Sequence, residues 1–324
     1  MNITIILCTH NRCQVLSKAL DSVAASKLPD TMEWEVLVVD NNSTDQTREV
    51  VEEFRRRYPE RFRYLFEPKP GKSYALNTGI RDARGEILAF IDDDVTVEPA
   101  WLQNLTSALH DGKWAGAGGR TLPASTFSPP RWLALAGPYS MVSILYARFD
   151  LGGAPRELDC APYGANMAFR KEMFKKHGGF RTDLGPSPTN EIPRPNEDTE
   201  FGRRLMAAGE HLRYEPSAIV YHPVPVDRIE KRYFLAWWFD YGRALVREAG
   251  KSQDSREIPK VIGRTLPMTL RWMRTFDPQL RFYRKCWVWV AAGEVVEIYR
   301  QARGTKAPRD SAMRQAGGEC SPRT

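Results

Sequence analysis

Short apolar runs alternate with stretches of helical spacing over residues 3–109. A β-branched run predicts a strand at residues 3–9, and further short runs predict strands at residues 35–40, 61–66 and 86–91. Apolar residues three or four positions apart predict helices at residues 12–26, 73–83 and 101–109, and another helix that ends near Tyr58. Ser43 and Gln46 have capping-box spacing before that helix. This alternation predicts an α/β fold, with a mostly parallel central sheet and helices on both faces.

The rest of the chain carries weaker patterns. Residues 123–162 are rich in Pro, Ser and Gly and include Trp132, Tyr139 and Tyr146, so we expect a long excursion that borders or covers a site. We then expect a strand at 163–170, a helix through 176, a loop at 183–196, a helix at 197–208 and a strand at 218–221.

Past Pro225 the pattern becomes helical and aromatic, at residues 229–248 and 282–303. From Gly304 onward Gly, Pro, Arg and Ser dominate. We therefore expect a main domain at 1–225, a basic and aromatic helical extension at 226–303, and a disordered tail at 304–324.

Composition narrows the class of protein. The chain has 324 residues, of which 42% are apolar and 27% charged, as in ordinary globular proteins. Its five cysteines form no CxxC pair, which argues against a disulfide framework and a structural zinc site. The N-terminus looks like a core strand and not a signal peptide, and no apolar stretch approaches the roughly 18 residues of a membrane span. We expect reduced thiols and a cytoplasmic protein.

Positive charge is concentrated late in the chain. Two acidic residues, Glu257 and Asp277, accompany eight basic ones there: Arg256, Lys260, Arg264, Arg271, Arg274, Arg281, Arg284 and Lys285. This bias suits an anionic partner.

Polar residues follow each of the first four predicted strands, most conspicuously Asp92, Asp93 and Asp94. Three adjacent carboxylates repel one another and need either open water or a cation. A solvated turn that caps the next helix is the plainer interpretation. In a parallel sheet, however, ligands sit beyond the carboxyl ends of the strands, and four polar strand ends converge there.

Six motifs in order resemble the inverting GT-A glycosyltransferases of family 2: THNR, VVDNNSTD, GKSYALNTGI, FIDDDV, GANMAFR and NEDTEFGRRL followed by YH. The resemblance covers about residues 2–225. It implies a GT-A fold and the inverting transfer of a sugar from a nucleotide-diphosphate donor to an acceptor hydroxyl, in bacterial polysaccharide or glycolipid synthesis.

The resemblance also implies a divalent cation, Mg²⁺ or Mn²⁺, which neutralises the leaving diphosphate. Asp94 corresponds to the direct metal ligand, and Asp92 and Asp93 lie near the ribose and donor sugar, with Asp92 a further candidate ligand. His222 fits the family's metal-side histidine, although a lone histidine at a strand end is more often an ordinary surface residue.

Further positions match the donor site. Thr9, Asn11 and Arg12 match the segment that contacts the nucleotide. Asp40 resembles the acid that accepts a pyrimidine N–H, which favours UDP or dTDP; its alternative role is helix capping with Ser43. Lys72 is placed to reach a phosphate, or else is a solvated loop lysine.

The acceptor side is assigned from the ED motif. Asp198 would take the proton from the acceptor hydroxyl, and Glu197 would orient the acceptor. Acids in a first helical turn also suit the helix dipole, so capping is a serious alternative for this pair. Asn166 resembles a position beside the donor sugar, or is a buried amide that ties its strand to a loop.

Departures from the family pattern limit the function. Arg271 and Trp272 occur without the glutamine of the processive synthases' QxxRW motif, which favours single addition. The basic, aromatic extension suggests peripheral docking to the inner face of the membrane, where a lipid-linked acceptor would lie; a homodimer interface is the alternative. We expect a saccharide or lipid-linked acceptor and no nucleic-acid partner.

Two other functions are weighed. A sugar nucleotidyltransferase would carry a glycine-rich loop after its first strand, and CTHNRCQVL has no glycine. A non-catalytic sugar-nucleotide-binding protein of the same fold would not need Asp94, Asp198 and His222.

Overall fold

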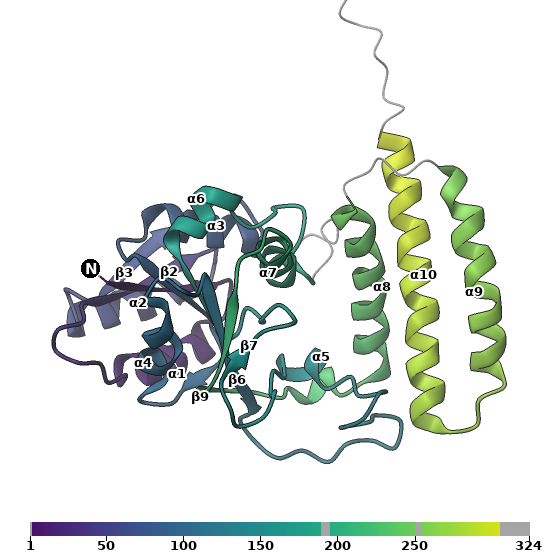
Figure 1. The fold of residues 1–324 in the computed structure, drawn as a ribbon, viewed down its shortest axis with the longest axis horizontal. Helices are drawn as coiled ribbons and strands as arrows, with labels where there is room; N and C mark the ends of the chain where they lie inside the picture. Colours follow the sequence, from purple (N-terminus) through teal and green to yellow (C-terminus); the bar gives the residue numbers. More distant parts are fainter. Residues whose placement is uncertain (1, 189–194, 250–254, 305–324) are drawn as a thin grey trace, which may run out of the picture.

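The computed structural model describes residues 2–188, 195–249 and 255–304. Within them, strands form one sheet in the order β3-β2-β1-β4-β8-β6-β9-β5, with β7 paired to β9 (Figure 1). The strands are β1 (Ile3–Thr9), β2 (Trp34–Asp40), β3 (Phe62–Phe66), β4 (Ile87–Asp92), β5 (Thr96–Val97), β6 (Gly116–Pro123), β7 (Arg156–Glu157), β8 (Met167–Arg170) and β9 (Leu212–His222). The predicted α/β fold is confirmed.

Pairing is parallel among β3, β2, β1 and β4, as the alternating pattern predicts, and between β6 and β9. β8 lies antiparallel between β4 and β6, so the second half of the sheet is mixed. The register pairs Thr9 with Asp40, and Cys8 with Asp92. The ends of β1, β2 and β4 therefore meet at one edge.

Helices cover both faces of this sheet. They are α1 (Cys13–Ala24), α2 (Thr47–Arg57), α3 (Lys72–Asp82), α4 (Trp101–Thr106), α5 (Ser143–Tyr146), α6 (Lys171–His177) and α7 (Glu197–Ala207), with short 3₁₀ turns at Ser107–Leu109, Val226–Arg228 and Ser255–Glu257. Ile5 packs into one apolar cluster with α1, α2 and α4, and Ile6 into another with α3, α6 and α7. Adjacent strand residues point to opposite faces, which explains why the middle of β1, residues 5–8, is apolar on both faces.

One local prediction is wrong, and two of the elements were missed. α2 begins at Thr47, whose N–H donates to Asp45 (3.1 Å), while Ser43 Oγ accepts the Asn11 N–H, so the predicted capping box is wrong. β6 and α9 (Ile258–Met273) were not predicted. Glycines in β6 and Pro267 in α9 obscure their patterns, because both residue types disfavour the element that they occupy here.

The C-terminal part forms a helical layer beside the sheet: α8 (Lys231–Glu248), α9 and α10 (Pro278–Gly304). α10 lies between α8 and α9 (Figure 1). A Cβ on Gly242 would fall 2.0 Å from the Val290 carbonyl oxygen, and one on Gly293 2.0 Å from that of Phe239. These glycines are required by the close approach of α8 and α10. The domain boundary near residue 225 stays a prediction. Gly304, where the predicted tail begins, still belongs to α10, and the rest of that tail, residues 305–324, lies outside the described residues.

Polar contacts attach α8 to α7. Glu248 accepts hydrogen bonds from Asn196 (2.7 Å), which directly precedes α7, and from Arg203 (2.7 Å) on it. Arg247 donates to the Asp183 carbonyl oxygen (2.8 Å). The helical layer is thereby held against the start of α7. Across the described ranges, every helix lacks the combination of length and apolar character needed to cross a bilayer.

Candidate active site

A cavity of about 810 Å³ opens at the carboxyl edge of β1 and β4. Most of the predicted site residues line it: Thr9, Arg12, Lys72, Asp92, Asp93, Asp94, Glu197, Asp198 and His222. Part of the 123–162 excursion also lines it, including Ser143 and Ile144, as predicted. The cavity brings the acidic triplet and the ED motif into one site, although more than a hundred residues separate them along the chain.

The acidic triplet is held by β1 and the turn after it. Asp93 accepts hydrogen bonds from Thr9 Oγ1 (2.7 Å) and Arg12 Nη1 (2.8 Å), and Asp94 Oδ2 accepts one from Arg12 Nη2 (2.5 Å). The side chains of Asp93 and Asp94 are only 6% and 2% exposed. Burial raises the pKa of Asp93 to about 7. The plainer interpretation of the triplet as a solvated turn is therefore wrong.

Asp94 and His222 present one unsatisfied edge. Asp94 Oδ1 is buried and has no hydrogen-bond partner among the residues described, and His222 Nε2 lies 3.7 Å from it. His222 Nδ1 lies 2.7 Å from the Pro223 carbonyl oxygen, so it donates there and leaves the Nε2 lone pair facing Asp94. His222 is itself buried, so it is not an ordinary surface histidine.

This pair fits a divalent cation, since a carboxylate oxygen and an imidazole nitrogen both ligate Mn²⁺. In the described part of the chain, no cluster of three or more His, Cys, Asp or Glu side chains is arranged to hold a metal. A cation here would therefore rely on diphosphate or water oxygens for its remaining ligands.

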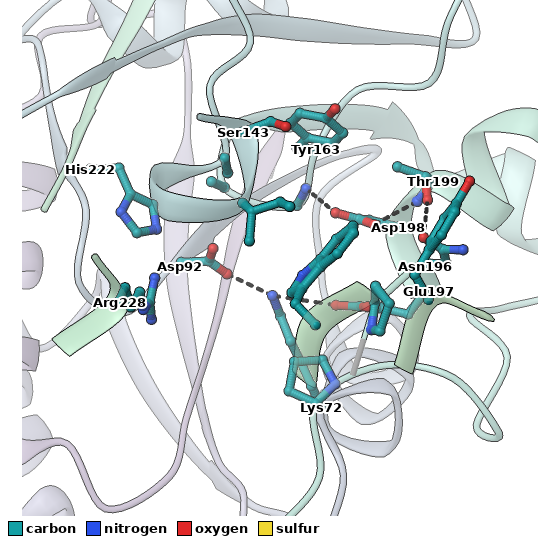
Figure 2. A pocket seen from close by; sticks show the side chains of 18 of the residues that line it. Lys72, Asp92, Ser143, Tyr163, Asn196, Glu197, Asp198, Thr199, His222 and Arg228 are labelled. Carbon is teal, nitrogen blue, oxygen red and sulfur yellow. Dashed lines mark hydrogen bonds and ion pairs between the residues drawn. The ribbon is translucent and has the colours of Figure 1, made fainter. Parts of the chain in front are cut away.

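Lys72 connects the two acidic groups. Its Nζ lies 2.6 Å from Asp92 Oδ1 and 3.5 Å from Glu197 Oε1 (Figure 2). Burial alone would lower the pKa of Lys72, but the carboxylates of Asp92 and Glu197 hold this pKa well above its ordinary value. The alternative of a solvated loop lysine is therefore wrong. Asp92, a predicted metal ligand, is an ion-pair partner of Lys72 here.

Asp198 and Glu197 occupy the first turn of α7. Asp198 Oδ2 accepts the Gly164 N–H (2.5 Å), and Oδ1 accepts the Thr199 N–H (2.6 Å). Burial raises the pKa of Asp198, and burial together with the Asp198 charge raises that of Glu197. Both side chains line the cavity, which capping alone would not require. Asp198 therefore stays a candidate general base, with its carboxylate lining the cavity and its pKa raised.

Three predicted residues lie outside the cavity lining. Asp40 accepts hydrogen bonds from the Ser43 N–H (2.9 Å) and the Tyr64 hydroxyl (2.8 Å). Asn11 Oδ1 accepts the Thr44 N–H (2.7 Å). Their contacts with a nucleotide stay predictions.

Asn166 is the third predicted residue outside the cavity lining. Its Oδ1 accepts the Trp101 Nε1–H (2.8 Å), and its Nδ2 donates to the carbonyl oxygens of Ala218 (2.8 Å) and Arg120 (3.1 Å). This full set of partners is that of a buried amide tying β8 to β6, β9 and α4, the alternative considered for this residue.

The sequence did not indicate that the helical layer lines the site. Part of the cavity lining consists of aromatic side chains from α8 and α10: Trp237, Trp238, Tyr241, Tyr283 and Trp287. The available signal was their near-alignment on one helical stripe, which burial against any partner would explain equally well.

Comparisons with known proteins agree with this geometry. The family described as glycosyl transferase family 2 matches residues 4–178. The succinoglycan biosynthesis protein ExoM of Rhizobium meliloti (strain 1021) is 30% identical over 241 residues, which are 73% of this chain and 70% of ExoM. The glycosyltransferase AglE of Haloferax volcanii is 27% identical over 234 residues, 72% of this chain and 70% of AglE.

A solved structure shares the fold. The mannosyltransferase PcManGT from Pyrobaculum calidifontis, in complex with GDP-Man and Mn²⁺, superposes with a TM-score of 0.56 at 19% identity, covering 95% of this chain and 76% of that one. With the match to the family over more than half of the chain, and the GT-A fold, the chain belongs to glycosyl transferase family 2 and is a glycosyltransferase.

Proposed function

We propose that the chain is a metal-dependent, inverting, single-addition transferase that uses a UDP- or dTDP-sugar. The observation that carries this proposal is one cavity with an unsatisfied Asp94–His222 edge on one side and the carboxylate of Asp198, the candidate base, on the other. A Mg²⁺ or Mn²⁺ ion bound by Asp94 and His222 would neutralise charge on the diphosphate. Mn²⁺ in the complex of the mannosyltransferase PcManGT supports the choice of ion.

The chain's own residues account for the rest of the reaction. Asp198 accepts the proton of the acceptor hydroxyl as the acceptor oxygen bonds to the anomeric carbon. The bond from that carbon to the donor phosphate breaks, and the nucleoside diphosphate leaves on the opposite side, which inverts the configuration. Arg12 and Lys72 lie beside the triplet, where cationic groups favour an anionic leaving group.

A nucleotide-sugar screen tests the proposal. UDP-, dTDP- and GDP-sugars are incubated with and without Mn²⁺, and nucleotide release and the anomeric configuration of any product are measured. We expect metal-dependent release of UDP or dTDP. Release of GDP alone would contradict the pyrimidine preference inferred from Asp40, and the absence of any metal-dependent nucleotide binding would contradict the proposed function.

We also propose that the enzyme docks on anionic membranes, near a lipid-linked acceptor, through α9. Val261 faces inward and is buried, whereas Ile262, Leu266, Leu270 and Met273, spaced at helical intervals, are exposed. Lys260 and Arg271 lie on other faces of α9 and Arg274 follows its last residue, whereas Arg264 pairs with Glu294 of α10. An exposed apolar stripe on a helix that also carries cationic side chains is typical of helices that lie in an anionic lipid surface.

Vesicle flotation tests this surface. With phosphatidylglycerol-containing vesicles at low salt, we expect the wild type and Val15→Asp, a matched change on α1, to float, and Leu266→Asp to stay behind. Each Lys or Arg near the surface contributes about 1 kcal/mol, so pure phosphatidylcholine should retain much less protein. Wild type that stays unbound, or a dimer that Leu266→Asp dissociates, would contradict the membrane role.

A further inference from the structure

The aromatic side chains that α8 and α10 contribute to the cavity are a candidate ligand surface. Trp237 and Tyr241 stack with ring centroids 5.6 Å apart and planes 11° apart. The ring centroid of Trp238 lies 5.1 Å from that of Trp287, and the ring centroids of Trp287 and Tyr283 are 6.3 Å apart. We call these five side chains the aromatic wall. All but Trp238 are only partly buried, so part of each of these side chains is accessible from the cavity that they line.

The wall lies on the Asp198 side of the cavity. Arg203, on the same helix as Asp198, lines the cavity and pairs with Glu248 of α8 (2.7 Å), which brings α7 and α8 together there. Tyr163 directly precedes Gly164, whose N–H donates to Asp198 Oδ2 (2.5 Å), and it lines the cavity together with Tyr241. Figure 2 shows Tyr163 and Asp198 close to each other.

A polar donor on the wall lacks a partner. The Trp238 side chain is buried, and its indole Nε1–H makes no hydrogen bond within the described ranges. Buried Trp N–H groups usually find an acceptor, and leaving one without a partner is unfavourable. A ligand with hydroxyl oxygens would provide one, and a purely hydrocarbon ligand would not.

We propose that the aromatic wall is the acceptor subsite and takes a pyranose ring, whose free hydroxyl is presented to Asp198. Sugar rings have apolar C–H faces and hydroxyl edges, and these match flat aromatic surfaces that carry hydroxyl and indole N–H groups. The inference rests on the proposed function, because it assigns the second substrate of the same cavity. The inference states that the sugar carrying the reacting hydroxyl binds the aromatic wall, whether or not the rest of the acceptor includes a lipid.

Variants of one helix provide the test. Trp287→Ala and Trp287→Phe alter the wall, and Trp289→Ala is a matched control on α10 outside the cavity lining. The probes are matched methyl and octyl glycosides of glucose, galactose and N-acetylglucosamine, assayed with the donor that the wild type accepts. UDP binding with Mn²⁺ is measured in parallel, and melting temperatures verify folding.

We expect Trp287→Ala to raise the acceptor KM about tenfold or more with methyl and octyl glycosides alike, with Trp287→Phe recovering most of the loss and Trp289→Ala near wild type. UDP affinity should stay unchanged in all three variants. An unchanged acceptor KM, a penalty confined to octyl glycosides, or a loss of UDP affinity would each overturn the saccharide subsite. If the wild type binds UDP with Mn²⁺ but transfers sugar to none of the probes, the saccharide subsite is overturned; if it also shows no metal-dependent nucleotide binding, the proposed function fails instead.

Discussion

Asp198→Asn is expected to bind the nucleotide-sugar donor normally and to transfer sugar about 10²–10⁴-fold more slowly, the range that general-base catalysis contributes. Asparagine preserves the shape of the side chain, and its single amide oxygen can still accept one of the two N–H groups, from Gly164 or Thr199, that the carboxylate holds with separate oxygens. It cannot take a proton from the acceptor hydroxyl. Single-turnover transfer and calorimetric UDP titration measure the two effects separately.

Glu200→Gln is the matched control for this variant. Glu200 lies on the same helix and pairs with Arg204 (2.8 Å), outside the cavity lining, so its neutralisation should leave transfer near the wild-type rate. Loss of donor affinity in Asp198→Asn would remove Asp198 from the base role.

The pH profile of the wild-type enzyme provides an independent test of this role. A general base must be deprotonated to act, so kcat/KM should fall as the pH drops through the pKa of Asp198. Because burial raises that pKa, the fall should occur at a higher pH than the pKa of an ordinary aspartate, about 3.9.

The first half of the sheet is predictable because its signals are local. β1 and β4 are continuous apolar runs, and parallel pairing then brings their polar ends together without any long-range information. The Asp triplet and Thr9 could be placed at one edge for this reason. The partners of the triplet follow from the same turn, since Arg12 comes directly after β1 and α1 begins at Cys13.

β6 could not be predicted, because its glycines are required by side chains that are distant along the chain. A Cβ at Gly116 would meet the Phe169 ring at 2.3 Å, and one at Gly119 would meet the Asn166 amide at the same distance. Glycine weakens a strand locally, yet only glycine leaves room for these side chains. The strand signal was removed by tertiary packing.

The aromatic wall was unpredictable for a related reason. The stripe that contains Trp237 and Tyr241 indicates a helix with a covered face, and nothing local to residues 229–248 states what covers it. The answer depends on Glu248 meeting Arg203 and on Arg247 meeting the Asp183 carbonyl, contacts between segments far apart in the chain. For Asp40, in contrast, the position was predictable and the contact was not. Its strand-end position was predicted, but the Tyr64 hydroxyl that occupies one of its oxygens comes from β3.

Asp94→Asn is expected to abolish the Mn²⁺ dependence of UDP binding and to slow transfer by about a hundredfold or more, because a metal that neutralises transition-state charge contributes several kcal/mol. The amide can still accept a hydrogen bond from Arg12, so the local fold should survive. It removes the anionic oxygen that faces His222 Nε2. UDP titrations with and without Mn²⁺ detect this loss independently of turnover.

Asp92→Asn and Asp111→Asn locate the metal. Asp92 is engaged by Lys72, so its amide variant should weaken donor binding with and without Mn²⁺ while preserving the difference between the two conditions. Asp111 accepts the Lys113 N–H in an exposed turn outside the cavity, and its variant should match the wild type. If Mn²⁺ dependence disappears in Asp92→Asn and persists in Asp94→Asn, the ion belongs to Asp92. Lys72 would then have to release that carboxylate when the donor binds, because one carboxylate oxygen 2.6 Å from an ammonium is poorly available to a cation.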